Sequence, residues 1–172
     1  MTTQTLFDFS DRDVIRGWGS VDDVVMGGVS RGSIVPTETG TALFSGVVRL
    51  ENNGGFSSVR ADFRPIDLSR FDGIALRVRG DGKRYGLYLQ DQMNRIASPL
   101  YYQSNFDTQP GVWQDVVLPF RTFGARWWGQ RIPAPPLNVR GVNSMNVIIE
   151  EKQKGSFALE IASISAYRSG MI

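Results

Sequence analysis

Neither histidine nor cysteine occurs in the sequence of 172 residues. Without cysteine the chain cannot form disulfides, use a thiolate nucleophile or build the usual structural zinc sites. Without histidine it has no imidazole to act as a general base, a metal ligand or the middle member of a Ser-His-Asp triad. The enzymatic mechanisms that stay open use carboxylate pairs, lysine or tyrosine.

Long apolar runs are also missing, since no window approaches the ~18 uncharged apolar residues that a membrane-spanning helix requires. The first residues, MTTQTLFDFSDRD, lack the basic and apolar regions of a signal peptide and the Arg-rich character of a mitochondrial presequence. We therefore expect a cytoplasmic protein with no membrane span, which reaches a membrane surface only through a protein partner.

Charge of one sign is not in large excess either, because the net charge is only +2 and basic residues lie close to acidic ones. Arg121, Arg126 and Arg131 form a loose series with Trp127 and Trp128, a combination that suits single-stranded nucleic acid. An exposed loop with solvated arginines accounts for the same series. We expect no nucleic acid partner.

Alternation of apolar and polar residues dominates the chain. In IALRVRG the apolar residues Ile74, Leu76 and Val78 interleave with other residues, which predicts a half-buried strand. The same period is expected to place further sets on single strand faces: Ala42, Phe44, Val48 and Leu50; Tyr85, Leu87 and Leu89; and Phe157, Leu159 and Ile161. About nine or ten short strands separated by Gly and Pro predict an all-β, antiparallel jelly-roll β-sandwich, with a closed barrel as the alternative.

The remaining segments predict turns, short helices and one long loop in a single domain over residues 1–172. NNGG at 52–55 and GDGKRYG at 80–86 are typical of hairpin turns, and the second lacks the spacing of a phosphate-binding loop. Short helices are expected around residues 11–17, in DLSRF after Pro65 and in FRTFG after Pro119. The segment RWWGQRIPAPPLNVRG, 126–141, is too rich in proline for strand or helix, and long loops of this kind are often functional.

The segment VDDVVMGGVSRG, 21–32, allows three interpretations. Asp22 and Asp23 are adjacent, so a glycosidase-like pair would need a second carboxylate, such as Glu51 or Asp62. As a second interpretation, Asp22, Asp23, Asn52 and Asn53 could supply the oxygen ligands of a calcium site, although they do not have the spacing of an EF-hand loop. In the third interpretation the carboxylates bond to nearby backbone N–H groups, and the glycines permit close approach of the chain. We favour the third, and we predict no catalytic residue, no metal site and no cofactor.

Arginines and tryptophans supply the remaining candidates for binding. Arg60 is the last residue of FSSVR, which continues as a strand. There it either pairs with Asp22 or Asp23 or points into a ligand groove. Trp127 and Trp128 either close the end of the core or stand exposed for a partner, as large exposed aromatics often do. The candidate partner or ligand contacts are Asp22, Asp23, Arg31, Asn52, Asn53, Arg60, Trp127 and Trp128.

Several of these stretches together resemble the CIA30 family, the complex I intermediate-associated protein 30 group. The matching segments, spread over about residues 18–168, are Trp18, DDVVMGGVS (22–30), LENNGGFSSVR (50–60), LRVRGDGKRY (76–85), VWQDVVLPFRTF (112–123) and FALEIASISAY (157–167). The resemblance implies a galactose-binding-domain-like jelly roll and an assembly factor that helps build respiratory complex I without joining it. The family offers no catalytic residues to transfer.

The leading hypothesis is therefore a non-catalytic assembly factor or chaperone that binds protein subunits of a membrane-bound respiratory or photosynthetic complex. The alternative is a jelly-roll carbohydrate-binding module with a glycan as its ligand. A carboxylate-based hydrolase is the third hypothesis, and it requires Asp22, Asp23, Glu51 or Asp62 to converge in a cleft.

Overall fold

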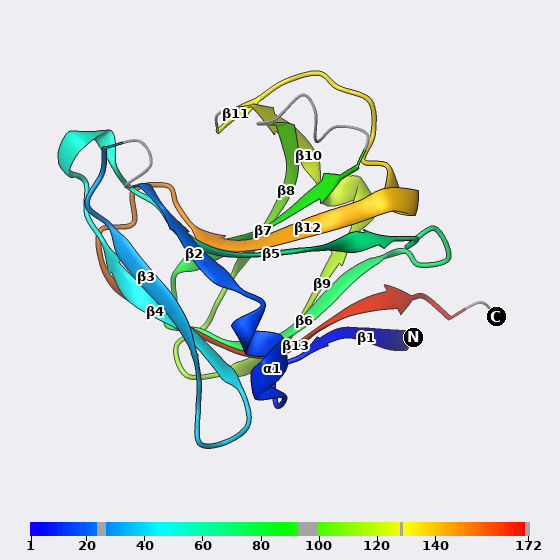
Figure 1. Ribbon diagram of the computed structural model, residues 1–172, viewed down its shortest axis with the longest axis horizontal. Coiled ribbons are helices and arrows are strands. Elements are labelled where there is room, and N and C mark those ends of the chain that lie inside the picture. Colours follow the sequence, from blue (N-terminus) through cyan, green and yellow to red (C-terminus); the bar gives the residue numbers. More distant parts are fainter. Residues whose placement is uncertain (24–26, 93–99, 128, 171–172) are drawn as a thin grey trace.

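Two antiparallel β-sheets form most of the computed structural model, which describes residues 1–23, 27–92, 100–127 and 129–170 (Figure 1). The sheets lie one above the other in Figure 1, and the apolar side chains between them form the core. The prediction of an all-β, antiparallel jelly-roll sandwich is confirmed.

One sheet has six strands within the described residues. In order across the sheet they are β3 (Arg31–Pro36), β4 (Ala42–Val48), β13 (Gly155–Arg168), β6 (Gly73–Arg79) and β9 (Trp113–Pro119), and β1 (Thr2–Asp8) also pairs with β13. The 14 residues of β13 allow this, because its first half pairs with β4 and its second half with β1. The two ends of the chain therefore lie on the same side of the molecule (Figure 1).

The other sheet has seven strands in the same ranges of the chain. In order they are β11 (Gln130–Arg131), β10 (Gly124–Trp127), β8 (Leu100–Asp107), β7 (Arg84–Asp91), β12 (Val142–Ile149), β5 (Ser57–Ile66) and β2 (Gly19–Asp22). In Figure 1, β8 and β10 rise from β12 and β5 on the side that faces away from the six-stranded sheet. That side of the sheet is consequently curved, and we call it the outer sheet face.

The core residues lie at alternate positions of the strands, as the period of two predicts. Ile74, Leu76 and Val78 of β6 are at most 1% exposed, and Leu87 and Leu89 of β7 are completely buried. Each fully buried aliphatic side chain of this size contributes about 1.5–3 kcal/mol relative to its exposed state. The predicted core faces of β6, β7 and β13 are confirmed.

Leu50 does not belong to the core face predicted for β4. That strand ends at Val48, and Leu50 is 38% exposed beyond it. The alternation in TALFSGVVRL thus continues past the point at which the chain leaves the sheet.

Both predicted hairpin turns are crossings between the sheets. NNGG contains the 3-10 turn η2 (Glu51–Asn53) and joins β4 of one sheet to β5 of the other. GDGKRYG likewise joins β6 to β7, and the Asp81 carboxylate accepts hydrogen bonds from the Tyr85 hydroxyl (3.0 Å) and the Ala158 N–H (2.8 Å). The hairpin prediction was wrong because glycine turns reverse the chain without specifying which sheet it enters next.

Helical structure is short, and α1 (Arg12–Arg16) is the five-residue helix expected near residues 11–17. The Asp11 side chain caps it by accepting a hydrogen bond from the Asp13 N–H at 2.9 Å. FRTFG forms the 3-10 turn η4 (Phe120–Thr122), and a further turn, η5 (Val139–Gly141), precedes β12. No helix in the described ranges is long and apolar enough to cross a membrane.

Two local predictions need correction. DLSRF is a turn after β5, in which Asp67 accepts a hydrogen bond from the Ser69 N–H at 2.9 Å. The segment 126–141 also contains strand residues, because β10 pairs with β8 and is followed by β11. The Pro-rich stretch that follows β11 is irregular, as expected.

Candidate functional site

Asp23 organises the junction of the segments around residues 23–30 and 49–56. Its side chain is 1% exposed and accepts hydrogen bonds from the N–H and hydroxyl of Ser30 (2.9 and 2.5 Å), the Gly55 N–H (2.7 Å) and the Phe56 N–H (3.3 Å). Burial by itself raises the pKa of this carboxyl, but the hydrogen bonds from Ser30, Gly55 and Phe56 outweigh it and hold the pKa below its ordinary value. The carboxylate therefore fixes the loop from inside.

Two glycines let the chain come close to this carboxylate. A Cβ on Gly28 would lie 2.4 Å from the Cγ of Asp23, and a Cβ on Gly54 would lie 2.6 Å from its Oδ2. Both distances are too short for any side chain. The glycines of the GG segments thus permit close approach, as the structural interpretation of the sequence expected.

Asp22 is half-buried and joins three strands. Its carboxylate accepts hydrogen bonds from the Gly32 N–H of β3 at 3.2 Å and from the Ser57 hydroxyl of β5. Arg60 pairs with neither aspartate of the segment; its Nε lies 2.9 Å from the Asp62 Oδ1. Of the two alternatives for Arg60, the ion pair with Asp22 or Asp23 does not form among the described residues.

The carboxylates proposed for hydrolysis do not converge. Glu51 lies 3.3 Å from Arg49, Asp62 pairs with Arg60, and the two aspartates of the 21–32 segment hold the loop described above. These residues consequently do not form the facing pair that glycoside hydrolysis requires. Among the residues that the structure describes, no three acidic side chains gather to hold a metal ion.

The other candidate contacts are spread over both sheets. Asn52 is exposed with φ +57° in η2, and Asn53 follows it there with its side chain outside the described part. Arg31 is exposed on β3 at the edge of the six-stranded sheet. Trp127 is 39% exposed on β10, four strands away from Arg60, and Trp128 lies outside the described residues. The structure does not bring these residues into one site.

A different set of residues does meet on the outer sheet face. They alternate with the core residues of their strands, and the pairing registers align them in one row across six strands. We call this row the cross-strand row, and its members in spatial order are Gly19, Arg60, Asn146, Tyr88, Gln103 and Gly124.

Tyr88 of the row and Tyr101 beside it form a stacked aromatic pair. Their ring centroids lie 4.0 Å apart with an interplanar angle of 17°. The Tyr88 hydroxyl donates to the Glu150 carboxylate at 3.5 Å, and the Gln103 amide donates to Glu150 and to the Asn105 oxygen, the latter at 2.6 Å. Burial, followed by the nearby Glu150 carboxylate, raises the pKa of Tyr88, so this phenol stays protonated.

The charges on the outer sheet face are balanced. Arg60 and Asp62 form an ion pair at 2.9 Å, and the Arg126 and Glu150 charges act in opposite directions on the pKa of Tyr88. Arg126 also donates a hydrogen bond to the Gly129 carbonyl at 3.2 Å. The face therefore offers donors and acceptors together without an excess of either sign.

Some hydrogen-bonding capacity on this face is not used by the protein. The Oε1 of Gln103, the Oγ of Ser144 and the Nε of Arg126 are buried and have no hydrogen-bond partner within the described part of the chain. Gln103 and Ser144 are each 3% exposed. Buried polar atoms without a partner are uncommon, and several on one face indicate a place for water or a ligand.

Sequence reasoning missed most of this face. The strand over 84–91 was interpreted through its core residues Tyr85, Leu87 and Leu89, and no face was predicted for the strand that carries Tyr101; Tyr88 and Tyr101 occupy outward positions. The available signal was a tyrosine at an outward position in each of these two strands. Which outward residues become neighbours depends on the strand order β8-β7-β12-β5, which is not the order of the sequence.

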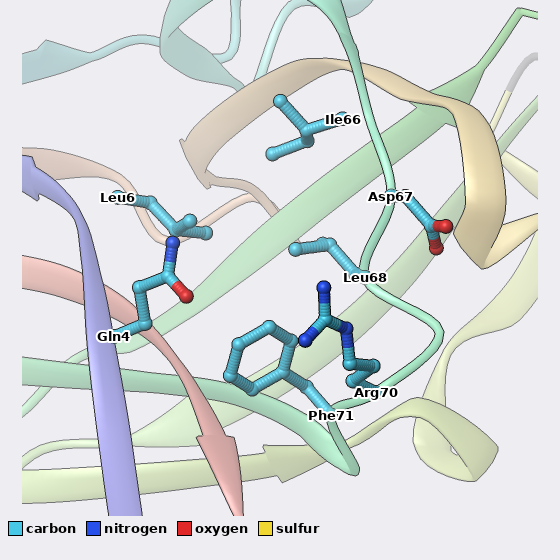
Figure 2. A pocket seen from close by; sticks show the side chains of 7 residues that line it. All are labelled: Gln4, Leu6, Ile66, Asp67, Leu68, Arg70 and Phe71. Atoms are coloured by element: carbon cyan, nitrogen blue, oxygen red, sulfur yellow. The ribbon is translucent and has the colours of Figure 1, made fainter.

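A recess lies between β1 and the turn after β5, away from the outer sheet face (Figure 2). In the view of Figure 2 the guanidinium of Arg70 lies between Leu68 and Phe71, and the Asp67 carboxylate is turned away from them. The volume of the recess, about 230 Å³, is below the range of roughly 300–1,000 Å³ that small-molecule sites usually have. The outer sheet face, with its larger set of convergent polar groups, is the stronger candidate.

Comparison with known proteins identifies relatives that share one name and one family. A family model described as Complex I intermediate-associated protein 30 (CIA30) matches residues 7–161. The mitochondrial Complex I intermediate-associated protein 30 of Drosophila melanogaster is 25% identical over 180 residues, which cover 92% of this chain and 61% of that protein. The Mus musculus protein of the same name is 30% identical over 104 residues, 59% of this chain and 32% of that protein. The chain thus spans less than two thirds of the length of these relatives.

Solved structures share the fold at low sequence identity. The family 11 carbohydrate-binding module of the cellulase Lic26A-Cel5E of Clostridium thermocellum has a TM-score of 0.73 and 16% identity, covering 98% of this chain and 96% of that one. The agarase AgWH50C has a TM-score of 0.68 and 11% identity, covering 100% of this chain and 25% of that one. These likenesses establish the β-sandwich architecture alone. The match of the family model over most of the sequence establishes more: the chain belongs to the CIA30 family.

Proposed function

We propose that the protein is a non-catalytic binding module that helps to assemble a membrane-bound electron-transfer complex by binding one of its protein subunits. The observation that carries this proposal is the family match over residues 7–161, because the relatives it identifies are named as complex I intermediate-associated proteins. The client is a subunit of a respiratory complex of the complex I type or of a photosynthetic complex.

The candidate contact for the client is the end of the seven-stranded sheet formed by β10 and the edge strand β11. Trp127 is 39% exposed there, and exposed tryptophans are common anchors of protein interfaces. A protein that binds its client in this way associates with the membrane surface through the client.

An affinity capture tests the proposal. The tagged chain is incubated with gently solubilised membranes of its source cells, and the bound proteins are identified by mass spectrometry. We expect enrichment of subunits of a respiratory or photosynthetic complex, and a loss of roughly tenfold with Trp127→Ala, the scale of an interface anchor. Recovery of no such subunit by the wild-type chain would contradict the assembly role.

The matched control is Trp113→Ala. Trp113 is a partly exposed tryptophan of β9 in the opposite sheet, where the guanidinium carbons of Arg77 and Arg79 lie 5.6 and 5.2 Å from its ring centroid. We expect this variant to capture the client as the wild type does. The melting temperature of Trp127→Ala should stay close to that of the wild type, and a large decrease would show that Trp127 belongs to the core.

Carbohydrate binding is a second candidate function, and it is favoured by the stacked tyrosines of the outer sheet face and by the buried polar atoms beside them that have no partner in the described part of the chain. It does not require the assembly role, and it is developed next.

A further inference from the structure

We propose that the cross-strand row of the outer sheet face binds a linear, uncharged oligosaccharide. This is a second binding activity, with its own site, and it does not rest on the assembly role. Three neighbouring features support this proposal: a polar row, a stacked tyrosine pair and open space at both ends of the row.

The shape of the row indicates a linear ligand that runs across the strands. Neighbouring strands lie about 4.8 Å apart, so the four spacings from Arg60 to Gly124 span about 19 Å. A Cβ built on Gly19 or Gly124, the two ends of the row, would meet no heavy atom within 4 Å. A ligand that contacts both Arg60 and Gln103 must therefore be an oligomer, and it can extend beyond either end.

The unpartnered atoms indicate groups that both donate and accept hydrogen bonds. Gln103 Oε1 needs a donor, Arg126 Nε needs an acceptor, and Ser144 Oγ can do either. Hydroxyl groups satisfy all three, but the atoms are closed to water, so a hydroxyl reaches them only when side chains of this layer move.

The charge balance indicates a ligand without net charge. Arg60 is already paired with Asp62 at 2.9 Å, and Glu150 accepts hydrogen bonds from Tyr88 and Gln103. A charged ligand would be attracted by the groups of opposite sign on this face and repelled by the groups of like sign, so net charge would bring no advantage.

Side chains at the surface of the face provide the first contacts. Tyr88, Tyr101, Asn105 and Glu150 are half-buried, so a ligand can touch their outer parts. The outer parts of the stacked tyrosine rings supply apolar contact for the C–H groups of a sugar ring, and the amide of Asn105, whose oxygen accepts from Gln103, lies beside them. Hydroxyl-rich rings combine these polar and apolar contacts in one molecule.

Calorimetric titration of the purified chain tests the proposal. The probes are cellotetraose, laminaritetraose, maltotetraose, mannotetraose and β-1,4-galactotetraose, each up to about 10 mM, with tetragalacturonate as the charged counterpart. We expect at least one neutral tetrasaccharide to bind with a dissociation constant of about 0.1–1 mM and to exceed tetragalacturonate at least tenfold in affinity. Absence of binding by all five neutral probes, or stronger binding of tetragalacturonate, would overturn the proposal.

Two variants locate the site without touching the core. Gly124→Phe adds a large side chain where a Cβ meets nothing within 4 Å, so the variant should fold and obstruct one end of the row. Asn105→Ala removes a half-buried amide beside the row. Each should weaken binding at least tenfold, whereas Arg77→Ala, an exposed side chain of the six-stranded sheet, should leave it unchanged. Unchanged binding in both folded row variants would place any saccharide elsewhere and refute the row as its site.

The same variants separate a saccharide from a polypeptide. If the neutral probes do not bind and Gly124→Phe abolishes capture of the client from membranes, the outer sheet face binds protein and the saccharide proposal is wrong. If the probes bind and client capture survives Gly124→Phe, the two activities use different surfaces. Failure of the membrane capture alone leaves the saccharide titration unaffected, because the titration contains no membrane component.

Discussion

At the scale of single residues, Asp23 is the position at which the loop geometry depends most on one side chain. Its carboxylate satisfies N–H groups of Ser30, Gly55 and Phe56, which come from two separate loop segments. A neutral amide can accept with one atom only and presents a donor in place of the second oxygen. The loop is therefore built for a charged carboxylate.

We expect Asp23→Asn to lower the free energy of unfolding by roughly 3 kcal/mol at pH 7, since several hydrogen bonds to a charged group are lost or weakened. The folded-state pKa of Asp23 is below its ordinary value, so its ionised form stabilises the protein above the unfolded-state pKa of about 3.9. This contribution disappears as the pH falls through the lower, folded-state pKa. The difference between wild type and variant should consequently shrink below about pH 4.

Urea unfolding at several pH values measures this difference. Asp115→Asn serves as the control, because its side chain is 72% exposed and its removal should change stability by no more than about 0.5 kcal/mol. A difference between wild type and Asp23→Asn that stayed constant from pH 7 to about pH 3 would show that ionisation of Asp23 is not what stabilises the loop.

At the scale of elements, the irregular stretch after β11 is tied to the sheets by a few hydrogen bonds. The Tyr102 hydroxyl donates to the Pro135 carbonyl at 2.6 Å, and the Asn138 N–H donates to the Asp91 carboxylate at 2.9 Å. The ring of Tyr102 is part of the core and is 2% exposed. The phenol of Tyr102 is thus one of the links between the core and this stretch.

Tyr102→Phe should release this stretch while the ring keeps its packing. We expect a decrease in stability of about 1 kcal/mol, the usual contribution of one hydrogen bond, and cleavage between residues 130 and 138 several times faster in limited proteolysis. The hydroxyl of Tyr85, which bonds to Asp81 on another loop, provides the comparison variant Tyr85→Phe. Faster cleavage of the same stretch in Tyr85→Phe would show that the effect is not specific to Tyr102.

Elements also show what the sequence can and cannot predict. The faces of β6, β7 and β13 were predictable, because the period of two is a local property of an extended chain. NNGG and GDGKRYG were assigned to hairpins because a glycine turn carries no information about the sheet that the next strand joins. The helix expected in DLSRF is a turn, although Asp67 accepts from the Ser69 N–H as Asp11 does from the Asp13 N–H at the start of α1, so a capping residue alone does not specify a helix.

At the scale of the whole molecule, the candidate site was the least predictable part. Arg60 was identified as a candidate, but its neighbours Asn146 and Tyr88 lie on β12 and β7, far away in the sequence. The partners of Asp23 are likewise brought together by two separate crossings between the sheets. These neighbours follow from the complete strand order, which short patterns do not contain.

The global stability of the sandwich should depend strongly on β13. Leu159 is completely buried and pairs with Phe44 of β4, while the later part of the same strand pairs with β6 and β1. We expect Leu159→Ala to cost about 3 kcal/mol through lost burial and the cavity it leaves. In hydrogen exchange, amide protection should fall together in β4, β6 and β1, and a loss confined to β4 would show that the sheet opens in parts.

The place of β13 in the chain has a consequence for synthesis on the ribosome. Translation delivers β3 with β4, and later β6 with β9, as two separate pieces of the six-stranded sheet, while β1 has emerged before either. The strand that joins all three, β13 (Gly155–Arg168), follows all of them in the chain. Until it leaves the exit tunnel, the nascent chain carries unpaired strand edges, which are prone to aggregation. A member of a family named for complex assembly thus completes its own six-stranded sheet only after the other five strands have been made.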